Sequence, residues 1–523
     1  MLKEQVKKLI ILKALEENPK TKEDFLKIER KVIEKFKSPF LFNFADLLKT
    51  YKKLLKKKKI QKNENLENIL KTSSTRSLSG IVSITVLTKP YPCPGKCLYC
   101  PTVNSMPKSY LPDEPACKRA LDNNFNPYKQ MLSRINALKA TGHNTDKIEL
   151  IVLGGTFSFY PKNYQLWFVK RCFEAANQKN SKTLKEAQKN NEKTKNRIVG
   201  LTIETRPDFI NQKELWFLRK LGVTRVELGV QAIDNEILKV NQRNCFLADI
   251  IKATKLLKNA GFKVTYHMML NLYGSNPLKD EQMFEELFSK PEFQPDQLKI
   301  YPCVVLKDSP LFNFYLNKEY QPYKDEELID LLIKIKEKIP PYVRIIRIIR
   351  DIPSNDIIAG NKIPNLRQLI TTKMEKENKK CRCLRCREPR ESVIEFKNIK
   401  LIRREYESSD GKEIFLSFED LKNDKVLSFL RLRLTNEWTF PFLKNSALIR
   451  ELHSYGLMAP LKSQKSNVQH KGLGKKLLEE AEKIVKKETN FKKIFIISGV
   501  GVREYYRKLD YRLFKNYMMK RIK

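Results

Sequence analysis

The fold is decided by the stretch YPCPGKCLYCP, Tyr91 to Pro101, which holds three cysteines in the spacing C-x3-C-x2-C. Cys93, Cys97 and Cys100 follow directly after the apolar run at 81–88. Three thiolates are too few for a structural zinc site, which takes four protein ligands. They can instead hold three irons of a four-iron, four-sulfur cluster and leave the fourth iron open. We therefore expect a [4Fe-4S] cluster whose free iron binds S-adenosylmethionine, with zinc as the alternative.

The segment from residue 81 to about 300 alternates apolar runs with amphipathic segments. Near-continuous apolar runs are typical of parallel strands that are buried on both faces. The expected strands cover 81–88, 147–155, 197–205, 224–231, 262–269 and 296–302. Six such β/α units predict an open or partial barrel, and in barrels of this kind the active site lies at the carboxyl ends of the strands.

Polar motifs stand at several of these strand ends. Gly154 and Gly155 follow the second strand and would let the backbone approach the methionine part of S-adenosylmethionine. The other candidate cofactor contacts at this edge are Glu204, Arg206, Gln231 and His267. Each could alone be a turn or cap residue. Their recurrence at successive strand ends favours a cofactor site.

A second group of thiols, Cys381, Cys383 and Cys386, lies in the basic stretch CRCLRC. A structural zinc ion with a fourth ligand from elsewhere is the preferred interpretation. A second cluster or a group of thiols without a metal are the alternatives, and the sequence does not identify the fourth ligand. The remaining cysteines are scattered and are expected to be ordinary buried thiols: Cys117, Cys172, Cys245 and Cys303.

The charge of the chain is strongly basic. Of its 523 residues 102 are Lys or Arg and 60 are Asp or Glu, which gives a net charge of +42. Such an excess favours a nucleic-acid partner, although a lysine-rich composition alone could produce it. The densest run, KKLLKKKKIQK at Lys52–Lys62, lies in a helical region over 1–75 that we expect to contact tRNA. No apolar run of about 18 residues and no signal peptide is present, so a cytoplasmic location is expected.

The second half of the chain predicts a further domain. Residues 76–340 are assigned to the barrel, 341–391 to a linker with the second thiol group, and 392–523 to an α+β domain. In that domain the segment Gln469–Gly474 reads Q-x-x-G-x-G and opens a helix. This pattern resembles the coenzyme A pyrophosphate loop of GNAT acetyltransferases, and free backbone N–H groups at a helix start suit a diphosphate. A plain glycine-rich turn is the alternative. The polar segment 177–197 is expected to be an exposed insertion.

In combination these motifs resemble the catalytic subunit of Elongator, in its stand-alone bacterial or archaeal form. From residue 72 onward the resemblance is carried by SGIVSITVLTKPYPCPGKCLYCP, PKSYLPDEPA, LIVLGGTF, GLTIETRPD, RVELGVQ, HMMLNL, DQLKIYP, VRIIRIIRDIP, CRCLRCRE, RELHSYG, QHKGLG and SGVGVREYYRKLDYR. The family joins a radical S-adenosylmethionine barrel to an acetyltransferase-like domain. The resemblance implies a modification of tRNA uridine 34 at C5 that gives 5-carboxymethyluridine, with acetyl-CoA as co-substrate.

The resemblance also implies site residues. Cys93, Cys97 and Cys100 would bind the cluster. The implied contacts to acetyl-CoA are Lys147, Glu451, Leu452, His453, Ser454, Leu473, Gly474, Lys475 and Tyr506. Where some members have a histidine before the N-L-R motif, this chain has Pro364, which puts a zinc ligand from that position in doubt.

The implied chemistry makes a demand on the architecture. The adenosyl radical would take hydrogen from the acetyl methyl, and the carbon radical would add to C5 of uridine before the thioester is hydrolysed. Acetyl-CoA must then reach the mouth of the barrel, so we expect a large basic cleft shared by the two domains. The rivals are a protein lysine acetyltransferase with a structural cluster, and a non-catalytic RNA-binding protein.

Overall fold

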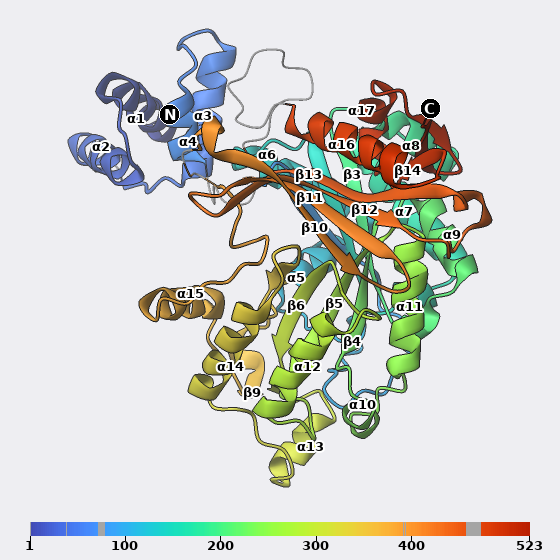
Figure 1. Cartoon of the computed structure of the whole chain (residues 1–523). Coiled ribbons are helices and arrows are strands. Elements are labelled where there is room, and N and C mark those ends of the chain that lie inside the picture. The colour runs from blue at the N-terminus through green and yellow to red at the C-terminus, as the bar shows by residue number, and fades with distance from the viewer. Residues whose placement is uncertain are drawn as a thin grey trace.

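The computed structural model describes residues 2–37, 39–71, 79–390, 392, 394–456 and 472–522. Most of the expected linker 72–80 and the residues Gln469–Lys471 of the expected coenzyme A loop lie outside these ranges. The chain forms an amino-terminal helical bundle, a barrel and a carboxyl-terminal sheet with helices (Figure 1). No helix in the described part of the chain is long and apolar enough to cross a membrane.

The amino-terminal bundle contains the expected helices. They are α1 (Leu2–Glu17), α2 (Lys22–Lys35), α3 (Phe44–Lys56) and α4 (Glu64–Leu70). In α3 the apolar residues Leu47, Tyr51 and Leu54 recur at helical spacing and are buried in the bundle core. The lysines between them face outward, and the Nζ atom of Lys52 donates to the carbonyl oxygen of Lys139, 3.0 Å away. The bundle therefore docks on the barrel through one face and presents a basic face to solvent.

The barrel is a seven-stranded, entirely parallel sheet, one strand more than expected. In spatial order its strands are β1 (Val82–Leu87), β2 (Lys147–Leu153), β3 (Arg197–Thr205), β4 (Arg225–Gln231), β5 (Lys263–Leu270), β6 (Gln297–Pro302) and β8 (Arg344–Arg347). All six pairings are parallel. Because β1 and β8 do not pair with each other, the barrel stays open on one side.

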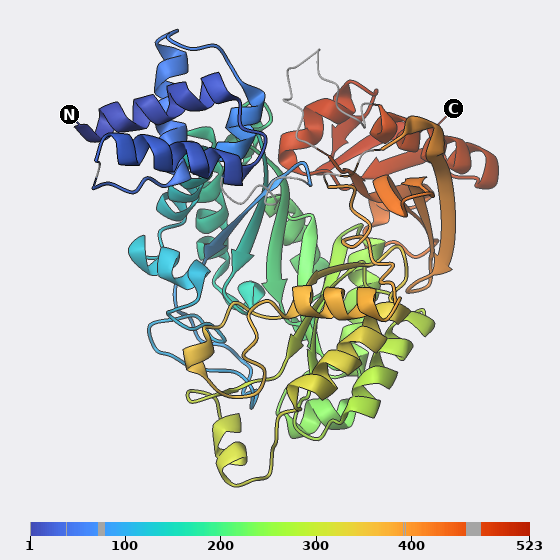
Figure 2. The same ribbon diagram turned by 90° about the vertical axis from the view of Figure 1, so that its left-hand side faces the viewer.

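Helices cover the outer surface of this sheet (Figures 1 and 2). They are α5 (Pro115–Asp122), α6 (Pro127–Ala140), α7 (Lys162–Asn177), α8 (Leu184–Asn191), α9 (Gln212–Leu221), α10 (Asn235–Val240), α11 (Leu247–Asn259), α12 (Pro277–Ser289), α13 (Leu311–Leu316) and α14 (Asp325–Lys338). Helix α15 (Leu366–Lys376) instead lines the cavity inside the barrel. A small two-stranded sheet, β7 (Val305–Leu306) with β9 (Ile357–Ala359), lies beside β6 and β8 in the chain.

The expectation of an exposed insertion at 177–197 is wrong. The segment contains α8, whose Ala187, Gln188 and Asn191 are buried against α7 and β3. The Asn191 amide donates to the Asn177 side chain, 2.8 Å away, and its carbonyl oxygen accepts from the backbone of Ile198. The polar composition misled because these side chains satisfy each other inside the fold instead of facing water.

The carboxyl-terminal domain is built on a mixed seven-stranded sheet. Its spatial order is β10 (Ile399–Glu407), β11 (Lys412–Asp420), β12 (Lys425–Leu434), β13 (Ser446–Ser454), β14 (Lys493–Ile496), β16 (Tyr517–Arg521) and β15 (Arg512–Phe514). All pairings are antiparallel except β13 with β14. That parallel pairing ends at Ile449, so the rest of β13 has β12 on one side only. Helices α16 (Leu473–Glu488) and α17 (Arg503–Arg507) complete the domain.

Buried charges join this domain to the amino ends of the barrel strands. The guanidinium of Arg450 on β13 contacts Asp296, which stands directly before β6, at 2.9 Å. It also donates to the carbonyl oxygen of Phe262, directly before β5, at 2.8 Å. Both charged side chains are fully buried, and removing one partner of such a pair costs about 3–5 kcal/mol. The carboxyl-terminal domain and the thiol loop therefore lie at opposite ends of the same sheet.

Candidate active site

The thiols of Cys93, Cys97 and Cys100 lie on the loop that follows β1, at the carboxyl end of the barrel sheet. All three line one large cavity of about 1920 Å³. Its wall also contains Ser83 near the start of β1, so the cavity runs along the inside of the sheet. The sequence prediction of a site at the strand ends is consistent with this position.

The thiol loop is packed so closely around Gly95 that a larger side chain would not fit at this position. The N–H group of Gly95 donates to the Cys93 sulfur, 3.5 Å away. A Cβ atom at Gly95 would lie 3.6 Å from the Cys97 sulfur and 2.6 Å from Nη1 of Arg206. That guanidinium nitrogen is buried and bonds to no described residue. The charge of Arg206 is paired with Asp208, 2.9 Å away, so what remains beside the three thiols is an unused N–H donor that suits a hydrogen-bond acceptor bound at this loop.

The spacing of the sulfurs fits a cluster better than a single ion. Around one metal ion, thiolate sulfurs lie about 2.3 Å from the metal and so within about 4 Å of one another. Among the described residues, the three sulfurs of this loop do not form a group within 4.8 Å, whereas those of Cys381, Cys383 and Cys386 do. Burial and the neighbouring Cys97 raise the pKa of Cys100 to about 11, so positive charge from bound iron is needed to keep it a thiolate.

The structure brings most of the predicted strand-end residues to the cavity. Gly155, Glu204, Arg206, Gln231 and His267 all line it. Gly154 does not line the cavity. Its φ is +146°, and an added Cβ atom would lie 1.8 Å from the hydroxyl oxygen of Thr88, so the turn requires glycine here. The hydroxyl of Thr156 lies 3.8 Å from the Cys93 sulfur, so this turn contacts the thiol loop directly.

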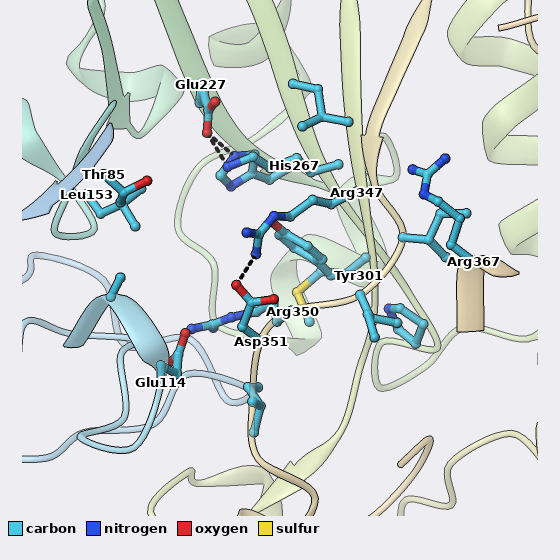
Figure 3. Close-up of a pocket in the computed structure, with 18 of the residues that line it drawn as sticks. Thr85, Glu114, Leu153, Glu227, His267, Tyr301, Arg347, Arg350, Asp351 and Arg367 are labelled. Atoms are coloured by element: carbon cyan, nitrogen blue, oxygen red, sulfur yellow. Dashed lines mark hydrogen bonds and ion pairs between the residues drawn. The ribbon is translucent and has the colours of Figure 1, made fainter. Parts of the chain in front are cut away.

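A row of charged side chains crosses the inner wall below the thiols. Glu204 on β3, Glu227 on β4, His267 on β5 and Lys299 on β6 face the cavity from neighbouring strands. Nε2 of His267 lies 2.9 Å from a carboxylate oxygen of Glu227, as Figure 3 shows. Lys299 forms an ion pair with the same oxygen. Burial would raise the pKa of Glu227, but Lys299 and His267 outweigh it and hold the pKa well below its usual range.

Arginines also line the cavity (Figure 3), and Arg347 on β8 continues the charged row beside Lys299 of β6. Arg347 contacts the carboxylate of Asp351 at 2.8 Å, and Arg350 contacts Glu114 at 2.8 Å. Arg367, Arg385 and Arg390 line the same cavity without an ion pair to a described residue. This arginine wall carries more cations than anions and suits a phosphate-bearing partner.

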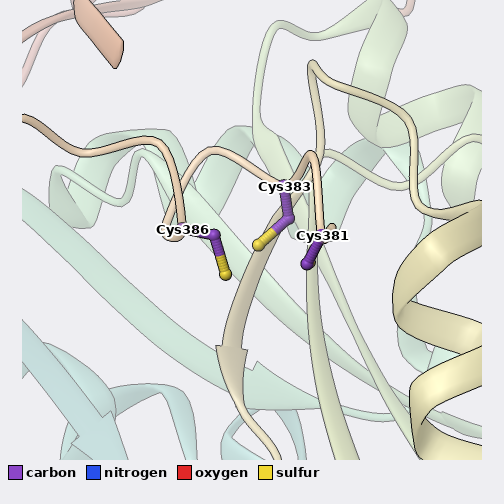
Figure 4. Close-up of side chains that lie close together, drawn as sticks. All are labelled: Cys381, Cys383 and Cys386. Atoms are coloured by element: carbon purple, nitrogen blue, oxygen red, sulfur yellow. The ribbon is translucent and has the colours of Figure 1, made fainter. Parts of the chain in front are cut away.

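The second thiol group is compact (Figure 4). Cys381, Cys383 and Cys386 point toward a common centre, and hydrogen bonds from the other two thiols lower the pKa of Cys383. Among the described residues no histidine or carboxylate completes this group as a fourth ligand. Cys381, Cys386 and Pro364 line the same large cavity as the first thiol group, and proline offers no ligand atom, so the doubt about a ligand from that position stands.

The candidate acetyl-CoA residues of the carboxyl-terminal domain come together. An added Cβ at Gly474, in the first turn of α16, would lie 3.5 Å from the Ser454 hydroxyl and 3.9 Å from Leu452. Leu473 and Lys475 flank that glycine in the same turn. The start of α16 therefore faces the part of β13 whose free edge lacks a strand partner.

Three of these residues do something the sequence did not indicate. The Glu451 carboxylate contacts Arg431 at 3.0 Å and Lys263 of the barrel at 3.3 Å, so it joins the domains. The ring of Tyr506 is buried in the domain core, and the hydroxyl of Tyr505 approaches Gly474 instead. Nε2 of His453 is buried and bonds to no described residue.

Lys147 stands at the amino end of β2, beside Arg197 of β3. The carboxyl-terminal domain packs at this end, because an added Cβ at Gly501 would lie 2.6 Å from Cβ of Arg197. None of the candidate acetyl-CoA residues lines the main cavity, which touches the described part of the carboxyl-terminal domain at Ser392 and Asn423–Lys425. Within the described part of the chain, the expected cleft shared by the two sites is therefore not formed.

Comparison with known proteins now decides the family. The model of the radical SAM superfamily matches residues 91–287, and that of the Radical_SAM C-terminal domain matches 295–376. The chain is 43% identical to a tRNA uridine(34) acetyltransferase of Methanocaldococcus infernus, over 100% of both chains. It is 36% identical to Elongator complex protein 3 of Homo sapiens, over 87% of this chain and 86% of the relative.

The chain belongs to the Elongator complex protein 3 family. A solved structure of archaeal Methanocaldococcus infernus Elp3 with an amino-terminal deletion is 44% identical, with a TM-score of 0.76. The match covers 85% of this chain and 100% of that one. The family drawn from the sequence motifs and the α/β partial barrel are thus confirmed.

Sequence reasoning missed several residues that this Elongator-type cavity contains. Glu227 lies in RVELGVQ, where only the strand-end residue Gln231 was a candidate contact, and Lys299 lies in DQLKIYP, where none was assigned. The available signal was a charged residue in the middle of an otherwise apolar strand, since a buried charge needs a partner or a cavity. Arg347 and Arg350 lie in a segment expected to be linker, and nothing in the pattern placed them against the thiols.

Proposed function

We propose that this chain is a tRNA uridine(34) acetyltransferase, as its relatives are named, and that it builds a carboxymethyl group on C5 of that uridine. The proposal is carried by one observation above all. A single large cavity contains an open set of three thiols, a row of polar groups from four strands and an arginine wall. The chain that holds it matches a tRNA uridine(34) acetyltransferase along its full length.

The cluster and S-adenosylmethionine would be held at the mouth of the barrel. Cys93, Cys97 and Cys100 are the proposed cluster ligands, and when bound these cofactors supply a carbon radical that can take hydrogen from an unactivated methyl group. Gly155, Glu204, Arg206, Gln231 and His267 are proposed as contacts of S-adenosylmethionine. The orphaned Nη1 of Arg206 supports this, as does the hydrogen bond from the Tyr110 hydroxyl, 2.5 Å long, that fixes the Glu204 carboxylate. Gly154 is retained as a proposed contact through its backbone only.

The tRNA would approach the arginine side of the cavity. An anticodon-loop base can be splayed out at modest cost, and a cavity of about 1920 Å³ admits a nucleotide. Arg347, Arg350 and Arg367 would contact its phosphates, and the basic face of the amino-terminal region 1–75 would contact the tRNA farther away. In the free chain Arg347 and Arg350 are paired with Asp351 and Glu114, so phosphate contacts would share or replace these ion pairs.

Acetyl-CoA would bind the carboxyl-terminal domain, which we propose to be GNAT-like over 392–523. Backbone N–H groups at the start of α16 are suited to its diphosphate. The unpaired edge of β13 over Glu451–Ser454 can accept hydrogen bonds from the pantetheine arm, and the orphaned Nε2 of His453 supports a polar ligand there. Lys147, Leu473, Gly474, Lys475 and Tyr506 are the further proposed contacts. The barrel would then occupy 76–340 and the linker 341–391. Strand β8 (Arg344–Arg347) falls in the linker range but belongs to the barrel sheet.

We further propose a structural zinc ion at Cys381, Cys383 and Cys386. Three sulfurs within 4.8 Å fit one tetrahedral ion. Elemental analysis of the purified chain should then find about one zinc per chain, and Cys383→Ser should lose zinc and keep its iron. Equal loss of iron in that variant would instead indicate a second cluster.

The function is tested by anaerobic reconstitution with tRNA, S-adenosylmethionine and acetyl-CoA. Mass spectrometry of the nucleosides should show 5-carboxymethyluridine with the wild-type chain. Cys97→Ser should abolish it, whereas Cys172→Ala, which changes a buried thiol outside the cavity, should retain it. If Cys97→Ser still modifies tRNA while the wild-type chain acetylates a lysine peptide, the rival lysine acetyltransferase is correct.

A further inference from the structure

The proposed reaction ends with a step for which no residue has been assigned. This step exists only if the proposed function is correct. The two-carbon unit joined to uridine then still carries coenzyme A as a thioester, and water must replace the sulfur. The thioester carbonyl is one bond from the carbon that is joined to C5. It must therefore lie in the same cavity as the uridine, and so must the group that activates the water.

The cavity offers few groups that could accept a proton. Eight carboxylates line it among the described residues, and seven of them are in ion pairs: Asp113, Glu114, Glu204, Glu227, Asp351, Glu388 and Asp424. The eighth, Glu375, is exposed on α15 at the rim. Burial would lower the pKa of Lys299, but Glu227 outweighs it and raises the pKa above its usual range, so this amine stays cationic. His267 is the one histidine in the cavity wall as described.

The surroundings of His267 have the geometry of a general base. Its Nε2 is engaged by the Glu227 carboxylate at 2.9 Å, and its ring stands edge-on to Tyr301 at 5.7 Å. Its Nδ1 bonds to no described residue, and Figure 3 shows the ring directed into the cavity. A carboxylate on one ring nitrogen fixes the tautomer and leaves the other nitrogen as the proton acceptor.

A metal ion is the competing use of these groups. Ligand atoms of Glu204, Glu227 and His267 lie within 4.8 Å of one another. The ammonium of Lys299, however, forms ion pairs with both carboxylates, at 3.6 Å from Glu204 and closer to Glu227. A divalent cation would have to displace this buried cation or lie beside it. Lys299 therefore already occupies the place of a cation between Glu204 and Glu227, and the imidazole of His267 is left for proton transfer.

We propose that His267 is the general base that hydrolyses the uridine–coenzyme A thioester. Nδ1 takes a proton from water as the water oxygen forms a bond to the thioester carbon. The carbon–sulfur bond then breaks, the leaving thiolate takes that proton from the ring to give free coenzyme A, and the second proton of the water goes to solvent as the product acid ionises to the carboxylate. No electron is gained or lost, and Glu227 keeps the ring oriented throughout.

The test is the variant His267→Gln, studied in the reconstituted chain with tRNA, S-adenosylmethionine and acetyl-CoA. Release of 5′-deoxyadenosine should fall by much less than the product does, because glutamine keeps a polar group where His267 is a proposed contact of S-adenosylmethionine and only the hydrolysis needs the base. Formation of 5-carboxymethyluridine should fall by about 10²-fold or more. The tRNA should instead carry uridine joined to coenzyme A, which hydroxylamine converts to a hydroxamate with a defined mass.

A second measurement removes radical chemistry altogether. The coenzyme A-bearing tRNA isolated from His267→Gln is offered to the wild-type chain without reductant, and wild type should hydrolyse it while His267→Gln does not. Met269→Leu, which changes the next inward-facing residue of β5 at nearly constant volume, should behave as wild type in both assays.

The outcomes separate the two proposals. Wild-type rates of 5-carboxymethyluridine in His267→Gln would overturn the role of this base. Loss of 5′-deoxyadenosine together with the product would also overturn it, because His267 would then act before carbon–carbon bond formation. If the wild-type chain itself forms no 5-carboxymethyluridine, the proposed function is wrong. This result is distinct from the two above, in which the wild-type chain forms the product.

Discussion

At the scale of single residues, His453 shows how burial sets the charge of a side chain in the proposed acetyl-CoA site. Burial lowers the pKa of His453 to about 4. The nearby cations Arg344 and Lys263 also lower this pKa, whereas the Glu451 carboxylate raises it. The ring packs edge-on against Tyr455 with centroids 4.5 Å apart. The folded chain therefore keeps this imidazole neutral at pH values where an unfolded chain would protonate it.

This difference predicts a pH-dependent loss of stability. Because the pKa is lower in the folded state, the contribution of His453 is fully present above about pH 6.5 and is lost as pH falls toward 4. The loss should be on the order of 2–3 kcal/mol. Thermal unfolding of wild type and His453→Gln at pH 7, 5.5 and 4.5 measures it as a difference between the two chains. Parallel pH profiles of the two chains would refute this assignment.

Single residues also mark what the sequence could and could not predict. Cys93, Cys97 and Cys100 were identifiable because their function depends on spacing along the chain. Glu227 and Lys299 were not, because in a strand buried on both faces the pattern does not say which side faces a cavity. The role of Tyr505 beside Gly474 depends on how α17 packs against α16, and two adjacent tyrosines give no signal that distinguishes them.

At the scale of elements, the contact between β3 and the short 3-10 helix Val500–Val502 fixes how the carboxyl-terminal domain is seated. A Cβ atom at Gly499 would lie 1.9 Å from the carbonyl oxygen of Val199, and one at Gly501 would lie 2.9 Å from that of Ile198. Backbone atoms cannot rotate away as a side chain would. These glycines are therefore required by the close approach of two elements.

Gly499→Ala should destabilise the chain by about 1–3 kcal/mol or more, because the methyl group forces the domains apart. Thermal unfolding should show a lower midpoint. Gly200→Ala is the matched control on the same strand: its added Cβ would meet only ordinary contacts, at 3.6 Å from Thr224 and 3.8 Å from Glu149. If the two variants unfold alike, the close approach is not what limits stability.

Element prediction succeeded where periodicity was strong. Six barrel strands were expected, and β1 to β6 match those ranges, with β5 ending one residue later than expected. The seventh, β8, was missed because Arg344–Arg347 is only four residues long, carries arginine at both ends and follows closely after a proline pair. The helix α8 was missed because its polar residues are buried in pairs, which a pattern of hydrophobicity does not reveal.

At the scale of the whole molecule, the net charge of +42 should govern tRNA binding. Each neutralised phosphate releases counterions, so the affinity falls steeply with salt. We expect the Kd to rise about 10²-fold or more between 50 and 200 mM salt. A chain that lacks residues 1–71 should bind more weakly and show a shallower slope, because it loses the basic face of α3. Filter binding or fluorescence anisotropy measures both slopes, and equal slopes would exclude the bundle from the interface.

The arrangement of the domains determines where the acetyl group of acetyl-CoA has to reach. The thiols lie at the carboxyl ends of the barrel strands, and the carboxyl-terminal domain packs against the amino ends. The cavity extends along the inside of the sheet between these ends. The account therefore requires the acetyl methyl group to reach the thiol end of the cavity, whatever path it takes.

Deuterium tracing tests that requirement most directly. The reconstituted chain is supplied with acetyl-CoA whose methyl group carries three deuterium atoms, together with tRNA and unlabelled S-adenosylmethionine. The account predicts one deuterium in 5′-deoxyadenosine and two in the methylene group of 5-carboxymethyluridine. Unlabelled 5′-deoxyadenosine, or an intact trideuterated acetyl group on a lysine, would contradict it.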